Sequence, residues 1–244
     1  GRRAGWGVQN ETSNTINDFA VSNTQPIVIG NLRQAGNYMI LGQGYSGVGR
    51  QLDISDNGAF KDFISGGKIG KAGTTLWFSV AIRPMNNNME CYISLSDENI
   101  AWLNNTAKSH LLSIGSFGGS TWGFAFGHEN SRVIFPGTIP VANNTPAFLV
   151  AKIEFGTPDT VSLYVNPTPG TEPDVSPVVG SGSDNLSFQS ISMNFSNGSL
   201  RMAADEIRFG NSYADVAPKK TTINTGYDSN HETAEVSVYP NPSA

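Results

Sequence analysis

The chain has few charged residues, a single cysteine and no long apolar run. Lys, Arg, Asp and Glu make up 14% of its 244 residues, against roughly a quarter in an average globular protein. The net charge of −5 argues against non-specific binding to nucleic acid or to an anionic membrane. No apolar run approaches the roughly 18 residues that a membrane-spanning helix needs. We therefore expect neither a nucleic-acid partner nor a membrane-spanning segment.

The single cysteine excludes an intramolecular disulfide. Cys91 lies in an apolar, strand-like segment, so we expect a buried small hydrophobic side chain rather than a nucleophile. The chain has 27 Gly and 13 Pro, and helical periodicity is scarce. This composition favours many short strands joined by polar turns, in one large all-β domain.

Apolar residues alternate with polar ones in segments that recur about every ten residues, a spacing typical of a sandwich or barrel. The clearest strands are predicted at 74–83, 147–155 and 160–165. The parity of the apolar positions changes between Leu186 and Phe195, which predicts a β-bulge near Gln189. Weaker strands are expected at 26–29, 38–41, 92–95, 111–115, 122–126, 132–135 and 206–209, and short helical turns at 59–64 and 212–216.

The apolar pattern ends at Pro218, and the residues that follow are polar. We therefore expect one domain over residues 1–218 and a polar linker over residues 219–234.

Four segments in order resemble bacterial laminin-G-like, concanavalin A-like jelly-roll domains. The first is 70–84 (GKAGTTLWFSVAIRP), and the others are 148–153, 163–170 and 205–216. The resemblance implies an all-β, two-sheet antiparallel jelly-roll sandwich, with a concave face or rim loops available for carbohydrate.

The segment 235–242 (EVSVYPNP) resembles the start of the C-terminal sorting domain that the type IX secretion system of Gram-negative bacteria recognises. The resemblance implies secretion, followed by release or attachment at the outer-membrane cell surface, with the type IX machinery as a partner. The rest of such a domain does not follow, so we expect residues 235–244 to be its truncated start. The alternative is an ordinary edge strand that ends at prolines.

Catalysis is not expected. Glycoside hydrolysis needs two carboxyl groups about 5–9.5 Å apart, and the Glu-x-Asp-x-x-Glu run of the related laminarinase-type enzymes does not occur here. Asp205 and Glu206 are adjacent, and adjacent residues of a strand point to opposite faces, so we expect that they cannot share a substrate. The three histidines lie in unrelated segments, which disfavours a polysaccharide lyase.

Aromatic residues suggest where a glycan would bind. Sugars stack on aromatic faces beside side chains that form hydrogen bonds. Trp102 is flanked by amides, Tyr45 lies in a glycine-rich loop, and Trp122 follows a Gly-Gly-Ser-Thr turn, so these three are the predicted ligand-binding residues. Trp6 and Trp77 are expected to pack in the core. The alternative is that each of the three is an ordinary core or rim aromatic residue.

A structural calcium ion is the one cofactor that the chain suggests. In many lectin-like sandwiches a carboxylate near the last strand holds calcium, and Asp205 occupies such a position. Asp53 and Asp56 lie in an oxygen-rich turn and are the other predicted metal ligands. The alternative is that all three aspartates only accept hydrogen bonds in turns.

Three classes of function remain. The family analogy favours a secreted or surface-exposed, non-catalytic, carbohydrate-binding module, with a polysaccharide or glycan as its partner and a monomeric state. The second class is a structural or adhesin domain with a protein partner or no ligand. The third, a diverged glycan-cleaving enzyme, is disfavoured by the missing carboxylate run.

Overall fold

The protein is described from a computed structural model. The described residues are 2–3, 6–8, 19–22, 27–34, 38–41, 48–55, 57–85, 90–97, 110–127, 131–182, 185–195 and 202–220.

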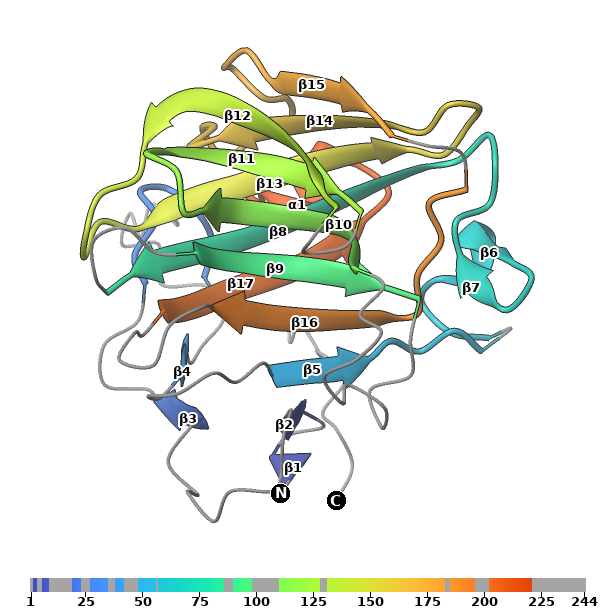
Figure 1. Ribbon diagram of the computed structural model, residues 1–244, viewed down its shortest axis with the longest axis horizontal. Coiled ribbons are helices and arrows are strands. Elements are labelled where there is room, and N and C mark those ends of the chain that lie inside the picture. Colours follow the sequence, from blue (N-terminus) through green and yellow to red (C-terminus); the bar gives the residue numbers. More distant parts are fainter. Residues whose placement is uncertain are drawn as a thin grey trace, which may run out of the picture.

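Two antiparallel sheets contain most of these residues (Figure 1). The eight-stranded sheet has the order β1-β2-β5-β16-β9-β10-β11-β12. Its strands are Arg2–Arg3 (β1), Trp6–Val8 (β2), Val48–Gln51 (β5), Ser190–Phe195 (β16), Glu90–Ser96 (β9), His110–Phe117 (β10), Thr121–Phe126 (β11) and Val133–Pro140 (β12).

The seven-stranded sheet has the order β15-β14-β13-β8-β17-β4-β3. Its strands are Val178–Ser181 (β15), Thr160–Val165 (β14), Ala147–Glu154 (β13), Thr75–Pro84 (β8), Met202–Gly210 (β17), Tyr38–Leu41 (β4) and Phe19–Ser22 (β3). A 3-10 turn, Lys61–Phe63 (η1), precedes a small hairpin of Ile64–Ser65 (β6) and Lys68–Ile69 (β7).

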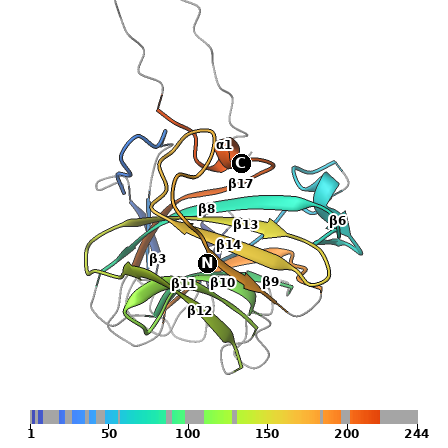
Figure 2. The ribbon, with the colours of Figure 1, turned by 90° about the horizontal axis from the view of Figure 1, so that it is seen from above.

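The core lies between the two sheets, which form separate layers when seen from above (Figure 2). The alternation predicted for β8 is confirmed, because Leu76, Phe78, Val80 and Ile82 are all buried in this core. Alternate residues of β13 and β14, among them Leu149, Ile153 and Leu163, point into the core in the same way. The predicted all-β, two-sheet jelly-roll sandwich is therefore confirmed.

A second apolar cluster covers part of the outer face of the seven-stranded sheet, the face turned away from the other sheet. It joins residues 27–32 to the short helix α1, Tyr213–Val216. The buried Ser79 hydroxyl lies within hydrogen-bond distance of two carbonyl oxygens, at 2.8 Å from Val216 O and 3.3 Å from Glu206 O. Figure 2 shows α1 on this outer side, above β17 and β8. The helix lies within the short helical turn predicted at 212–216, and Ser212 and Asp215 cap it with a reciprocal capping box.

The parity of the inward apolar residues changes after Phe188, as the sequence predicted. Phe188 pairs with Ile69 in an isolated bridge, whereas Ser190 begins β16 and pairs with Ser96 of β9. The chain thus changes pairing partner at Gln189, and the apolar residues on both sides of it still face the core. The Gln189 N–H also donates to Ser96 O at 2.9 Å, so Gln189 and Ser190 together oppose Ser96 of β9, and the predicted bulge is confirmed.

Contacts with the sandwich continue to Lys220. Lys219 bridges Leu32, and the Lys220 N–H donates to Asn31 O at 2.7 Å. The predicted sorting segment and the rest of the predicted linker lie outside the described residues.

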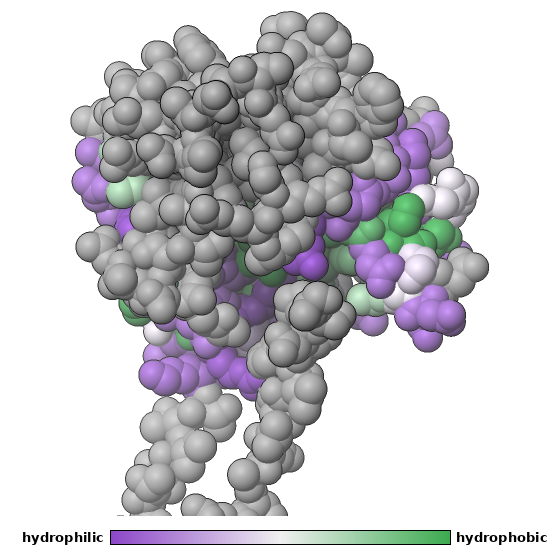
Figure 3. Space-filling view, turned by 90° about the horizontal axis from the view of Figure 1, so that it is seen from below, coloured by the Kyte–Doolittle hydropathy of each residue, from purple (hydrophilic) through white to green (hydrophobic). Residues whose placement is uncertain are grey.

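Within the described ranges no helix is long and apolar enough to cross a membrane. The described surface seen from below is mostly hydrophilic, with a hydrophobic patch at the right (Figure 3).

Candidate functional site

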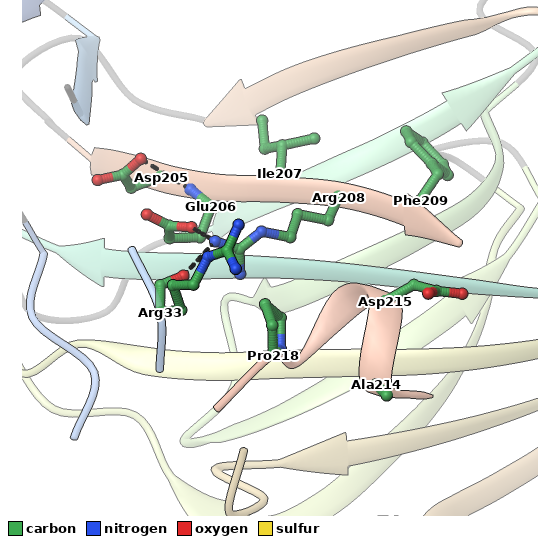
Figure 4. Close-up of a pocket in the computed structure, with 9 residues that line it drawn as sticks. All are labelled: Arg33, Asp205, Glu206, Ile207, Arg208, Phe209, Ala214, Asp215 and Pro218. Carbon is green, nitrogen blue, oxygen red and sulfur yellow. Dashed lines mark hydrogen bonds and ion pairs between the residues drawn. The ribbon is translucent and has the colours of Figure 1, made fainter. Parts of the chain in front are cut away.

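A cavity of about 620 Å³ opens on the outer face of the seven-stranded sheet, beside α1. Its lining combines charged side chains of β17 with Arg33 and with residues of α1 and the segment that follows it, all on the same face of the sheet (Figure 4). The lining residues are Arg33, Asp205, Glu206, Ile207, Arg208, Phe209, Ala214, Asp215 and Pro218.

A β-bulge in β17 brings two carboxylates into this cavity. Asp205 pairs with Ala81 and Arg208 with Ser79, so Glu206 and Ile207 together oppose one residue of β8. Glu206 has a φ of 57°, in the left-handed region that side chains rarely adopt. The expectation that Asp205 and Glu206 point to opposite faces is therefore wrong, because the bulge interrupts the alternation and both line one cavity.

The charges in the cavity are largely paired. The Arg208 guanidinium forms an ion pair with Glu206 and donates to Arg33 O at 2.5 Å. One oxygen of Asp215 accepts hydrogen bonds from the backbone N–H groups of Asn211 and Ser212 and from the Ser212 hydroxyl. Glu206 and Asp215 are thus committed to contacts within the protein.

Asp205 differs from these two residues. It is 8% exposed, its Oδ1 accepts from the Glu206 N–H at 2.8 Å, and its buried Oδ2 has no hydrogen-bond partner among the described residues. The pKa of this carboxyl is raised to about 6, chiefly by burial; the Glu206 charge also raises it, while the hydrogen bond from the Glu206 N–H and the Arg208 charge lower it. A buried carboxylate oxygen without a partner is costly, and a cation or a proton would relieve that cost.

The predicted calcium ligands are not brought together within the described residues. Asp53 follows β5 of the other sheet and does not line the cavity. Its carboxylate accepts from the Ser55 N–H at 3.1 Å and from the Ser55 hydroxyl at 2.7 Å, and these bonds lower its pKa. Asp56 lies outside the described residues, and no group of three potential metal-binding side chains occurs within them. Asp205 alone fits as one ligand of an ion that takes six to eight oxygens.

Of the three predicted ligand-binding aromatics, one can be placed. Trp122 is 2% exposed and packs in the core between the sheets, so it offers no face to a sugar and the prediction at this position does not hold. Its alternation with Phe124 and Phe126, also in the core, was the signal that indicated burial. Tyr45 and Trp102 lie outside the described residues.

The centre of the eight-stranded sheet is closed on its outer face. One row of small residues crosses five strands there, and each member is buried. The row is Gly49, Ser192, Ser94, Ser113 and Ala125. The Ser94 and Ser113 hydroxyls lie 2.8 Å apart and satisfy one another. The small residues of this row are therefore buried and offer no exposed side chain to a ligand.

An aromatic pair, Trp77 and Tyr164, lies on the part of the seven-stranded sheet that α1 leaves partly uncovered. The two half-buried rings are stacked, with centroids 6.0 Å apart and an angle of 23° between their planes. Tyr213 of α1 supports Trp77 edge-on at 5.6 Å. The expectation of a core position for Trp77 therefore needs correction, since the ring packs against the outer apolar cluster and is only half-buried.

The sequence held a signal for this position. Lys152 pairs directly with Trp77 across the strands, and Glu154 is the next residue on the same face. Two charged residues on a face indicate that the face is partly solvated, so an aromatic residue beside them is partly exposed.

Comparison with known proteins gives the fold alone. No protein-family model matches the chain, and no curated protein matches it. The chain is similar to the globular domain of T. cruzi calreticulin, with a TM-score of 0.55 and 8% identity over 86% of this chain and 84% of that one. It is also similar to endo-β-1,4-glucuronan lyase from the fungus Trichoderma reesei, with a TM-score of 0.52 and 12% identity over 90% of this chain and 100% of that one. The chain is similar as well to the cellulose-induced protein Cip1, with a TM-score of 0.52 and 12% identity over 85% of this chain and 91% of that one.

Proposed function

We propose that this protein is a non-catalytic, carbohydrate-binding β-sandwich module of the laminin-G-like, concanavalin A-like kind. The observation that carries the proposal is the stacked, half-buried pair of Trp77 and Tyr164 on a partly solvated sheet face. Aromatic rings held rigidly beside polar side chains suit the apolar faces and hydroxyl edges of sugars. Two proteins of similar fold are named for a glycan substrate or for induction by cellulose, which agrees with this choice.

The state of the cavity carboxylates supports a non-catalytic role. Glycoside hydrolysis requires one carboxyl group to donate a proton and a second, accessible one to act on water or sugar. Glu206 is paired with Arg208, and the free oxygen of Asp205 is buried. Neither group is presented to a polysaccharide.

We also propose that Asp205 is a ligand of a structural calcium ion. The ion would neutralise the buried carboxylate and thereby stabilise the bulge; it has no chemical role in our proposal. The test is the melting temperature in calcium and in EGTA, for the wild type and for Asp205→Asn. We expect a rise in calcium that the variant lacks, and an equal melting temperature in both solutions would remove the proposal.

The cellular location is a further part of the proposal. The resemblance of 235–242 to a sorting signal supports secretion through the type IX machinery and a place at the cell surface, as a monomer. Deletion of residues 235–244 from the full protein in its own host would then retain it inside the cell. Normal export of the deleted form would overturn this part.

The binding proposal is tested by retention on insoluble polysaccharides and by a glycan array. We expect wild-type protein to bind and Tyr164→Ala to lose most of that binding, with its melting temperature measured to confirm that it is folded. Tyr92→Leu is the matched control, because Tyr92 stacks on Phe117 at 5.3 Å on the other sheet and is 3% exposed.

Two results would contradict the proposal. No binding by folded wild-type protein to any glycan would favour a structural domain with a protein partner. Equal binding by wild type and folded Tyr164→Ala would place the glycan elsewhere.

A further inference from the structure

From the side chains around the aromatic pair, we infer that this face binds an extended, uncharged, unbranched glycan chain that lies across the strands. The inference rests on the proposed function and specifies its ligand. Its basis is the strand register, which fixes the side chains that share the outer face with Trp77.

Two parallel rows cross β8, β13, β14 and β15 on this face. The first row has mainly apolar surface, because it contains an indole ring, a lysine stem and a valine. It consists of Trp77, Lys152, Ser162 and Val179. The second row carries hydroxyl and carboxylate groups. It consists of Thr75, Glu154, Thr160 and Ser181.

Both rows are partly open to solvent, although Ser162 in the first row is buried. Val179 is 56% exposed, and the side chains of Lys152 and Glu154 are 31% and 44% exposed. Strands lie about 4.8 Å apart and alternate residues about 7 Å apart along a strand. The rows therefore run side by side for about 14 Å, the distance across three strand spacings. A single sugar would cover only part of that length, whereas a short chain would cover all of it.

The pairing of charges selects an uncharged ligand. Lys152 Nζ lies 2.7 Å from Glu154 Oε1, and the two rows contain no other charged side chain. A carboxylated chain would find no free cation here and would meet the exposed Glu154. A neutral chain can place its apolar ring faces on the first row and its hydroxyl groups against the second.

The test compares isothermal titration of three soluble probes on the full chain. The probes are a disaccharide and a hexasaccharide of β-linked glucose, and a hexasaccharide of β-linked glucuronate. We expect the neutral hexasaccharide to bind at least about tenfold more tightly than either other probe, a difference of about 1.4 kcal/mol.

The variant Val179→Asp tests the far end of the first row without touching the aromatic pair. It should weaken the neutral hexasaccharide at least about fivefold, because it places a charge under an apolar ring face, and leave the disaccharide unchanged. Val133→Asp is the matched control, since Val133 is 60% exposed on β12, an edge strand of the other sheet. Each folded variant is checked by its melting temperature.

Failure of the inference is distinct from failure of the proposed function. Three results would overturn the inference and still leave a carbohydrate-binding protein. They are glycan binding that does not depend on chain length, tighter binding of the glucuronate probe, and equal weakening by Val133→Asp and Val179→Asp. Absence of binding to every glycan in the array would overturn both.

Discussion

Replacement of Asp205 by asparagine should stabilise the calcium-free protein above pH 7. The pKa of this carboxyl rises from 3.8 to about 6 in the folded state, chiefly through burial. Between these two values the folded protein binds more protons than the unfolded chain, so its stability falls as the pH rises through that interval. A tenfold change in proton affinity is worth about 1.4 kcal/mol. At a pH above both pKa values, the ionised Asp205 therefore lowers the free energy of unfolding by up to about 3 kcal/mol.

Asparagine removes the charge and keeps an oxygen that can accept from the Glu206 N–H. In EGTA, urea unfolding at pH 8 should show the variant to be more stable than wild type by about 1–3 kcal/mol. At pH 3 the difference should shrink towards zero, because Asp205 is then protonated in the folded protein. A variant that is less stable than wild type at pH 8 in EGTA would refute the reasoning.

Three further predictions concern other parts of the fold. Trp122→Ala should lower the unfolding free energy by about 3–5 kcal/mol in urea titration, because it empties a site in the core; a loss below about 1 kcal/mol would contradict a core position. Cys91 should react with a thiol reagent at pH 8 only after denaturation, because burial raises its pKa to about 12, and rapid reaction of the native protein would contradict this. Ser212→Ala should cost about 1 kcal/mol through loss of the α1 cap, whereas Ser212→Asp should retain most of that stability.

The strands of the core could be predicted from the sequence because burial on one face imposes a period of two. In β8 every second residue from Leu76 to Ile82 points inward and is apolar. In β13, Lys152 and Glu154 mark the solvated face. The same period of two, applied to the strand that contains Trp122, places this residue in the core. The prediction that Trp122 is exposed came instead from the polar turn that precedes it. Local composition therefore misled where periodicity would have been right.

The candidate site could not be predicted in the same way. Asp205 and Glu206 share a cavity because Glu206 adopts a left-handed backbone conformation within a bulge, and a glutamate gives no signal of that conformation. The exposure of Trp77 depends on where α1 ends on the sheet, which is set by tertiary contacts with Tyr213. Both features arise from packing between segments more than 100 residues apart in the chain.

The contacts of the segment after β17 have a consequence for how the polypeptide matures. Leu32 and Val216 belong to the outer apolar cluster, and Leu32 also bridges Lys219, so the cluster joins segments that are far apart in the chain. Ala81 and Phe148 share this cluster with Val216 and Ala217, so a chain emerging from the ribosome cannot complete the cluster until residue 217 has appeared. Completion of the domain is therefore a late event, and the nascent form must stay unaggregated with part of a sheet uncovered. Pulse-chase proteolysis of stalled chains ending before and after α1 would show protection only in the longer ones.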